Sequence, residues 1–199
     1  LKDILAQLSG KSKKQKATLV IDFDEEEEAD ILAQLAVPYM ERSILAQAAL
    51  SAALLDIDNT LDTQDNRVRN FIKRWTVKLG KSNAETTHKV VNDKLKEWAA
   101  NEDASIADLK QSLKEYFGET APAERIARTE VSRASGYATQ TVYQDAGAVG
   151  KKWIAAIDER VCPICNDLDG QVTELSGFFD TIDGDSVQHE PAHPNCRCD

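Results

Sequence analysis

The residues best suited to chemistry are four cysteines and a histidine near the end of the sequence. Cys162 and Cys165 form a C-x-x-C pair, and Cys196 and Cys198 form a C-x-C pair shortly after His193. Two thiolates at C-x-x-C spacing converge on one tetrahedral ion, and a second pair brought across a hairpin completes its shell at about 2.3 Å per Zn–S bond. The candidate metal ligands are therefore Cys162, Cys165, His193, Cys196 and Cys198.

A structural zinc ion and structural disulfides are alternative uses of these cysteines. Zinc is favoured for a protein that folds in a reducing cytosol. A redox use of the C-x-x-C pair requires a thioredoxin-like βαβ setting, which the surrounding sequence lacks. Either structural use would fasten the segment between Cys162 and Cys198, which contains few large apolar residues.

Two other segments match the sequence patterns of known enzyme sites. The segment from His189 to His193 matches the H-E-x-x-H of zinc proteases, whose histidines must lie one turn apart on a helix, and Pro191 disfavours that helix. Asp56 and Asp58 begin a D-x-D-x-T sequence like that of haloacid-dehalogenase-type phosphatases, in which the first aspartate is the nucleophile and the second the acid/base. That fold needs strands alternating with helices afterwards, whereas helical patterns follow here. We expect no enzyme, no catalytic residue and no small-molecule substrate, with a phosphatase or a metal hydrolase as the alternatives.

The elements that must position the cysteines are mostly helices. Pro38 should kink or break the first one, and Gly80 should end the second in a left-handed conformation. Ser105 should cap the fourth, with Asp108 three residues later. From apolar residues at helical spacing, helices are predicted over residues 30–56, 63–79, 84–100, 105–117 and 122–145.

The residue pattern of the last part of the chain is no longer helical. Residues 151–157 and 170–175 have strand character and should pair as a hairpin, and the stretch after them looks irregular. The predicted fold class is α+β, a mainly α-helical body followed by a small C-terminal β-hairpin module clamped by cysteines and histidine. Three parts are expected: an extended or poorly ordered arm over 1–29, a helical body over 30–120 and the module over 121–199.

Charge and composition limit the partners. The 199 residues carry a net charge of -10, so the whole chain should be a poor non-specific ligand for nucleic acid. Residues 67–96 nevertheless contain nine basic residues against two acids.

The longest mostly apolar stretch, residues 44–57, is shorter than the ~20 residues needed to span a membrane. No signal peptide is visible. The tetrapeptide Ile-Leu-Ala-Gln occurs three times at unequal intervals, as ordinary helix composition or as a reused docking helix.

Several short motifs of the last third occur in one order. They are Ala127-Arg128-Thr129-Glu130, Lys152-Trp153, Asp158-Glu159-Arg160-Val161-Cys162-Pro163-Ile164-Cys165, Leu168-Asp169-Gly170 and Pro191-Ala192-His193-Pro194-Asn195-Cys196-Arg197-Cys198. As a set, they resemble the phage head morphogenesis, or Mu F-like, minor head proteins. The resemblance covers residues 122–199, and it departs from the family where Ala192 replaces the second proline of a Pro-Pro pair before the histidine.

This resemblance implies a virion protein of the phage head, assembled in the host cytoplasm. It implies action at the portal vertex, in head assembly or in DNA packaging and delivery, with the portal or other head proteins as partners. Contact with DNA would fall to the basic helices between Arg67 and Lys96. A cellular zinc-binding adaptor is a further alternative, since it would share the cysteine-bearing tail.

Overall fold

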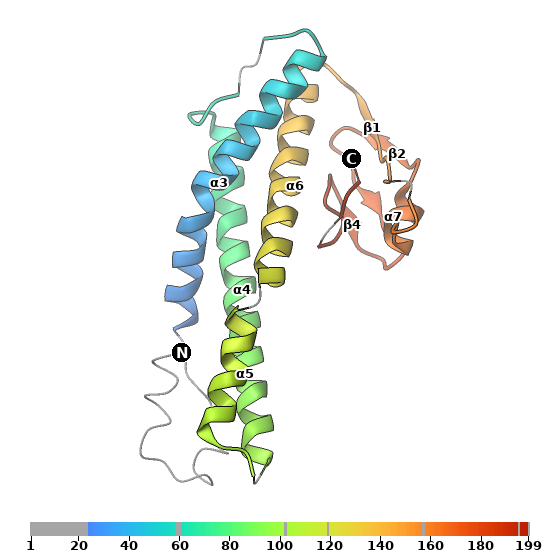
Figure 1. Ribbon diagram of the computed structural model, residues 1–199. Helices are drawn as coiled ribbons and strands as arrows, with labels where there is room; N and C mark the ends of the chain where they lie inside the picture. Colours follow the sequence, from blue (N-terminus) through green and yellow to red (C-terminus); the bar gives the residue numbers. More distant parts are fainter. Residues whose placement is uncertain are drawn as a thin grey trace. The chain divides into compact units, whose positions relative to one another are not determined.

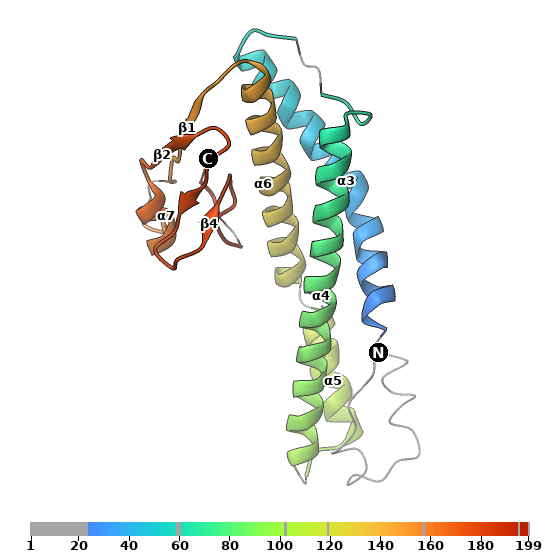
Figure 2. The ribbon, with the colours of Figure 1, turned by 180° about the vertical axis from the view of Figure 1, so that it is seen from behind.

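The chain is mainly helical, with two small strand pairs near its C-terminus. The computed structural model describes residues 24–58, 61–101, 103–118, 120–156, 158–194 and 196–198. The elements are α3 (Glu25–Leu54), α4 (Asn66–Ala100), α5 (Ile106–Gly118), α6 (Thr120–Asp145), β1 (Gly150–Lys152), α7 (Pro163–Leu168), β2 (Val172–Glu174), β3 (Phe179–Asp180) and β4 (Ser186–Val187) (Figures 1 and 2). The predicted α+β class, a helical body followed by a small β module, is confirmed.

The beginning of the chain is only partly described. Residues 1–23 of the predicted arm lie outside the described residues, and α3 begins at Glu25, before the expected boundary at residue 30. Contacts divide the chain into two compact units, one made of residues 1–36 and 74–120 and the other of residues 37–73 and 121–199. The three-part division along the sequence stays a prediction. Within the described ranges, no helix combines the length and apolar character that a bilayer crossing requires.

The first unit shows why the predicted break at Gly80 is wrong. α4 runs without interruption from Asn66 to Ala100. A Cβ atom built on Gly80 would come within 2.2 Å of the Ala29 carbonyl oxygen, so the missing side chain lets α3 and α4 approach closely. A glycine inside a helix costs about 1 kcal/mol relative to alanine, which the helix–helix packing must offset.

α5 packs against the end of α4 in the same unit. The buried cluster consists of Val91, Leu95, Trp98, Leu109 and Leu113. Ser105 and Asp108 cap α5 reciprocally as predicted, because the Ser105 N–H donates to the Asp108 carboxylate at 2.7 Å and the Asp108 N–H donates to Ser105 Oγ at 3.3 Å.

In the second unit, the last part of α3, the first turns of α4 and the helix α6 pack on one another. Phe71 of α4 stacks on Tyr137 of α6 with ring centroids 3.9 Å apart. Gln47 of α3 donates to the Thr139 hydroxyl at 3.1 Å. The expected break at Pro38 does not occur, since α3 continues through it.

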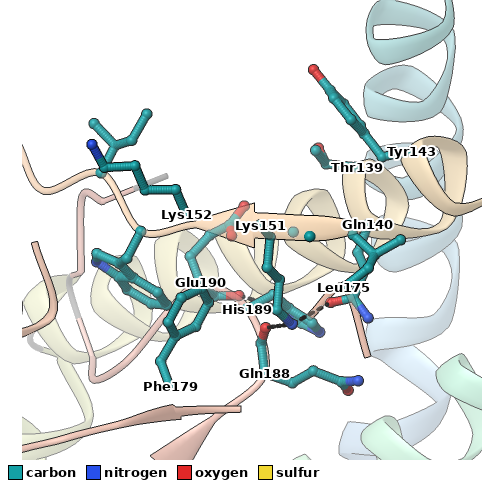
Figure 3. A pocket seen from close by; sticks show the side chains of 14 residues that line it. Thr139, Gln140, Tyr143, Lys151, Lys152, Leu175, Phe179, Gln188, His189 and Glu190 are labelled. Carbon is teal, nitrogen blue, oxygen red and sulfur yellow. Dashed lines mark hydrogen bonds between the residues drawn. The ribbon is translucent and has the colours of Figure 1, made fainter. Parts of the chain in front are cut away.

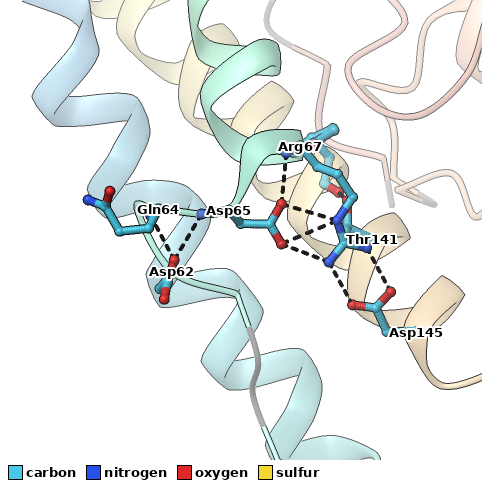
Figure 4. A network of polar contacts seen from close by, with 7 residues as sticks. Asp62, Gln64, Asp65, Arg67, Thr141 and Asp145 are labelled. Carbon is cyan, nitrogen blue, oxygen red and sulfur yellow. Dashed lines mark hydrogen bonds and ion pairs between the residues drawn. The ribbon is translucent and has the colours of Figure 1, made fainter.

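Arg67 ties the start of α4 to the end of α6 (Figure 4). Its guanidinium donates to both carboxylate oxygens of Asp145, at 2.7 and 3.0 Å, and to Asp65 at 2.8 Å. The hydrogen bonds that Arg67 donates to Asp145, and then those that it donates to Asp65, raise the pKa of Arg67, and the bond that Asp65 accepts from Arg67 lowers the pKa of Asp65. One of the nine basic residues of the stretch 67–96 is therefore neutralised locally.

The C-terminal module contains the predicted hairpin. β1 and β2 pair antiparallel, with Lys151 opposite Thr173. A second, shorter pair, β3 and β4, lies in the stretch that the sequence predicts as irregular. The module has its own core, which consists of Trp153, Ala155, Cys165, Leu168, Phe179, Cys196 and Cys198.

Candidate metal centre

The first cysteine pair is positioned by the short helix α7. Cys162 is its N-cap residue, with an extended backbone, and its sulfur accepts a hydrogen bond from the Cys165 N–H at 3.4 Å. Pro163 occupies the first turn, where its fixed φ and missing N–H cost nothing. Cys165 thus returns to the same side of the turn as Cys162, and it is buried.

The second group of candidate ligands meets the first one. The Nε2 atom of His193 lies 3.0 Å from the sulfurs of both Cys162 and Cys165. The sulfurs of Cys165 and Cys196 are 3.7 Å apart. Two sets of ligand atoms lie within 4.8 Å of one another, namely Cys162, Cys165 and His193, and Cys165, Cys196 and Cys198. Since Cys165 belongs to both sets, the structure brings all five sequence-predicted ligands to one place.

The donor set and its spacing fit a metal ion. Two sulfurs bound at about 2.3 Å to one tetrahedral zinc ion are roughly 3.8 Å apart, and the Cys165–Cys196 distance of 3.7 Å agrees with this. The two sulfur–nitrogen distances of 3.0 Å are shorter than the roughly 3.6 Å of a tetrahedral site. The cluster is positioned to hold a metal ion.

The surroundings of His193 and Cys165 favour coordination. Nδ1 of His193 lies 2.9 Å from the Pro194 carbonyl oxygen, and an Nδ1–H donated to this oxygen leaves the lone pair on Nε2, which faces the sulfurs. Burial raises the pKa of the Cys165 and Cys196 thiols, so an ion must displace protons when it binds. All four cysteines are free thiols in this structure, and disulfides between the same residues stay the alternative.

An ion pair closes the module beside the cluster. Arg197, between the last two cysteines, donates to both carboxylate oxygens of Asp158 at 2.6 and 2.8 Å. These bonds hold the pKa of Asp158 well below its usual range. The adjoining cavity, which is lined by Cys162, Cys165, His193 and Cys198 among others, measures 30 Å³. About one water molecule fits such a space. A second cavity, of 530 Å³, borders the cluster on the side of Cys196 and Cys198.

The histidine and aspartates of the enzyme-like motifs lie elsewhere. Nδ1 of His189 is 2.7 Å from the Glu190 carbonyl oxygen, and its ring packs beside Phe71 and Tyr137. Residues 189–193 form no helix, which the metalloprotease motif would need. Asp56 follows the end of α3 with a φ of 55°, whereas the phosphatase motif requires it at the end of a strand.

Reasoning from the sequence missed the groups that support the ligands. The Cys-Pro dipeptide at residues 162 and 163 is a readable signal for a helix N-terminus. Two other contacts depend on the folded loop, namely that of His193 with the Pro194 carbonyl and that of Asp158 with Arg197. No local sequence pattern indicates them.

Comparison with known protein families assigns the second half of the chain. Residues 101–199 match the family model described as Phage Mu protein F like protein. This half of the chain belongs to that family. The match begins earlier than the motifs at residues 122–199 indicate, and it includes α5.

Two curated proteins are similar to the chain. An uncharacterized protein of Bacillus subtilis, YqbB, is 29% identical over 189 residues, which is 89% of this chain and 60% of the relative. A protein of Enterococcus faecalis named NAD(+)--arginine ADP-ribosyltransferase EFV is 30% identical over 161 residues, which is 75% of this chain and 32% of the relative. The chain thus spans less than two thirds of the length of either relative. No solved structure matches it significantly.

Proposed function

We propose that the protein is a non-enzymatic minor head protein of a phage. It acts at the portal vertex, in head assembly or in DNA packaging and delivery, and a structural zinc ion fastens its C-terminal module. The family match supports the phage head, and the portal and the other head proteins are the partners that this role requires. Its place is the virion.

The observation that carries the structural role is the convergence of five candidate ligands around the buried Cys165. Cys165, which belongs to both ligand sets, is 3% exposed, and Cys196 and Cys198 are buried as well. A catalytic zinc site keeps a position open for water and substrate, whereas a structural site is filled by protein ligands. Five candidate ligands for four positions favour the structural type.

Thiolates and one imidazole favour zinc among the common metal ions. Calcium and magnesium prefer oxygen ligands, and none of the five candidates supplies oxygen. The ion would be held by Cys165, by Cys162 and by two of His193, Cys196 and Cys198. Bound there, it joins α7 to the chain end and so stabilises a module with a core of seven buried residues.

The transferase name of the Enterococcus faecalis relative does not by itself extend to this chain. This chain corresponds to 32% of that protein, and the shared part takes in most of the present sequence. We propose that the shared part is the head-protein portion and that transferase activity belongs to the remainder of the relative.

The proposal is tested by metal analysis and thiol titration of the purified full chain, with and without chelator. We expect about one zinc ion per chain, and thiols that react only after chelation. Cys165→Ser should lower the zinc content at least about tenfold. The variants His193→Gln and His189→Gln make the same chemical change inside and outside the cluster, so only the former should weaken zinc retention.

Two results would contradict the proposal. Thiols that stay unreactive after chelation and react only after reduction would establish disulfides instead of zinc. Absence of the chain from purified mature particles and from isolated heads, tested by mass spectrometry, would remove the head function while leaving the metal centre intact.

A further inference from the structure

A cavity separate from the metal centre lies beside β1 (Figure 3). It measures 380 Å³ and is lined by residues of α6, of β1 and of the loop after β4. Tyr143, Trp153, Leu175 and Phe179 supply large apolar and aromatic surfaces. This volume lies in the range of known ligand sites, and none of the five candidate metal ligands lines it.

One edge of β1 borders this cavity without a partner strand. The described sheet has two strands, β1 and β2. The backbone N–H of Trp153 donates to the Gln171 carbonyl oxygen at 3.0 Å. Along an antiparallel ladder, residues that bond the partner strand alternate with residues that do not. The N–H and C=O groups of Gly150 and Lys152 therefore point away from β2. Both residues line the cavity.

The indole of Trp153 adds an unsatisfied donor. Trp153 is 1% exposed, and its Nε1–H has no hydrogen-bond partner among the described residues. The indole of Trp98, in contrast, donates to the Ser105 carbonyl at 2.7 Å. A buried donor without a partner costs about 1–3 kcal/mol, and an acceptor brought by a ligand would remove that cost.

The charge beside this edge is positive. Lys151 lies over the Phe179 ring, 5.3 Å from its centroid, and Figure 3 shows its ammonium directed at Gln140 and the Gln188 carbonyl. Lys152 is exposed and forms no ion pair with any residue that the structure describes. Glu190 is the one acid among the lining residues. Two lysines against one carboxylate favour an acidic ligand.

We propose that the free edge of β1 binds an extended, acidic and apolar segment of a partner protein by strand addition. The backbone of the segment pairs with the outward groups of Gly150 and Lys152, its apolar side chains enter the cavity, and a carboxylate meets Lys152. Strand addition draws affinity from the backbone and specificity from side-chain pockets, and this edge offers both. The surface is distinct from the metal centre.

A blocked synthetic peptide tests this chemistry. The probe is Thr-Leu-Val-Ile-Asp-Phe-Asp, the sequence of residues 18–24, because it is apolar, strand-forming and acidic. Added to the labelled full chain, it should shift the NMR signals of the Gly150 and Lys152 amides and of the Trp153 indole, and leave the Trp98 indole unchanged. The same peptide with both aspartates replaced by lysine should bind at least about tenfold more weakly.

Two proline variants form a matched pair. Lys152→Pro removes an N–H from the proposed edge, and Val172→Pro removes the corresponding N–H from the opposite edge of the same sheet, since the two residues face each other in the register. Lys152→Pro should weaken binding at least about tenfold and Val172→Pro by less than about twofold.

Lys152→Glu keeps the N–H and tests the charge if the proline variant fails to fold. Equal weakening by both prolines, equal binding of the lysine peptide, or no binding of the probe would overturn the proposal.

Discussion

His189 illustrates at the scale of one residue how packing sets a charge. Burial lowers its pKa to about 4, and the positive charges of Arg133 and Lys151 act in the same direction. The neutral ring is thus the folded form at neutral pH, and its Nδ1–H has the Glu190 carbonyl oxygen as acceptor at 2.7 Å. In the unfolded chain, the same ring would titrate near 6.5.

His189→Gln should make the free energy of unfolding less dependent on pH. Because the folded pKa is depressed, the unfolded chain binds the extra proton between about pH 6.5 and 4, and stability is lost as the pH falls through this window. The loss attributable to His189 is about 1–2 kcal/mol between pH 6.5 and 5. Urea unfolding of both proteins at these two pH values measures it. The candidate metal ligands are the same in both proteins. If both lost the same free energy of unfolding between the two pH values, His189 would not titrate as described.

Residue types at fixed spacing predict five candidate ligands, and the structure places these side chains near one another. The two members of each cysteine pair lie together because short turns are local. The approach of the two groups is a long-range contact, since 31 residues separate Cys165 from Cys196. The sequence could not indicate that Trp153 would be buried with an unsatisfied N–H, since this depends on α6 and on the loop after β4.

At the scale of elements, Gly80 separates what local rules can predict from what packing decides. The rule that glycine follows a helix end predicts two helices, and the structure has the single helix α4. Gly80 serves a contact with Ala29, which is far away in sequence. Ser105 and Asp108 were predicted well because a cap is made within four residues.

Gly80→Ala should therefore destabilise the protein despite the better helix propensity of alanine. The propensity gain is about 1 kcal/mol, and forcing a methyl group against a backbone carbonyl costs about 1–3 kcal/mol or more. Because the atoms in the way belong to the backbone of Ala29, the upper part of this cost, about 2–3 kcal/mol, applies, and we expect a net loss of about 1–2 kcal/mol in urea unfolding. Gly118→Ala is the control in the same unit, since no atom lies within 4 Å of its Cβ position, and it should change stability by less than about 1 kcal/mol. A stabilised Gly80→Ala variant would show that the two helices are not in close contact.

At the scale of the whole molecule, the charge distribution limits contact with DNA. The chain carries a net charge of -10, and part of its basic stretch is already engaged. Arg67 binds Asp65 and Asp145, and Lys94 donates to Ser112. Lys81 and Lys89 are exposed and form no ion pair within the described ranges.

We expect weak DNA binding that is confined to low salt. Fluorescence anisotropy with duplex DNA should detect binding near ~50 mM salt and lose it near ~200 mM. The double change Lys81→Glu and Lys89→Glu should reduce the slope of log affinity against log salt by about 2. The matched change Lys110→Glu and Lys114→Glu on α5 alters the net charge equally and should leave the slope unchanged. Equal effects of both pairs would show that the stretch 67–96 is no DNA contact.

The cysteine cluster is bordered by two cavities of very different size. The 30 Å³ space beside Cys162 and His193 admits about one water molecule, whereas the 530 Å³ cavity beside Cys196 and Cys198 has room for a small molecule. Under the proposed zinc site, a chelator or a competing ion would therefore attack from the second side. Radioactive zinc added to the assembled protein would exchange through that opening.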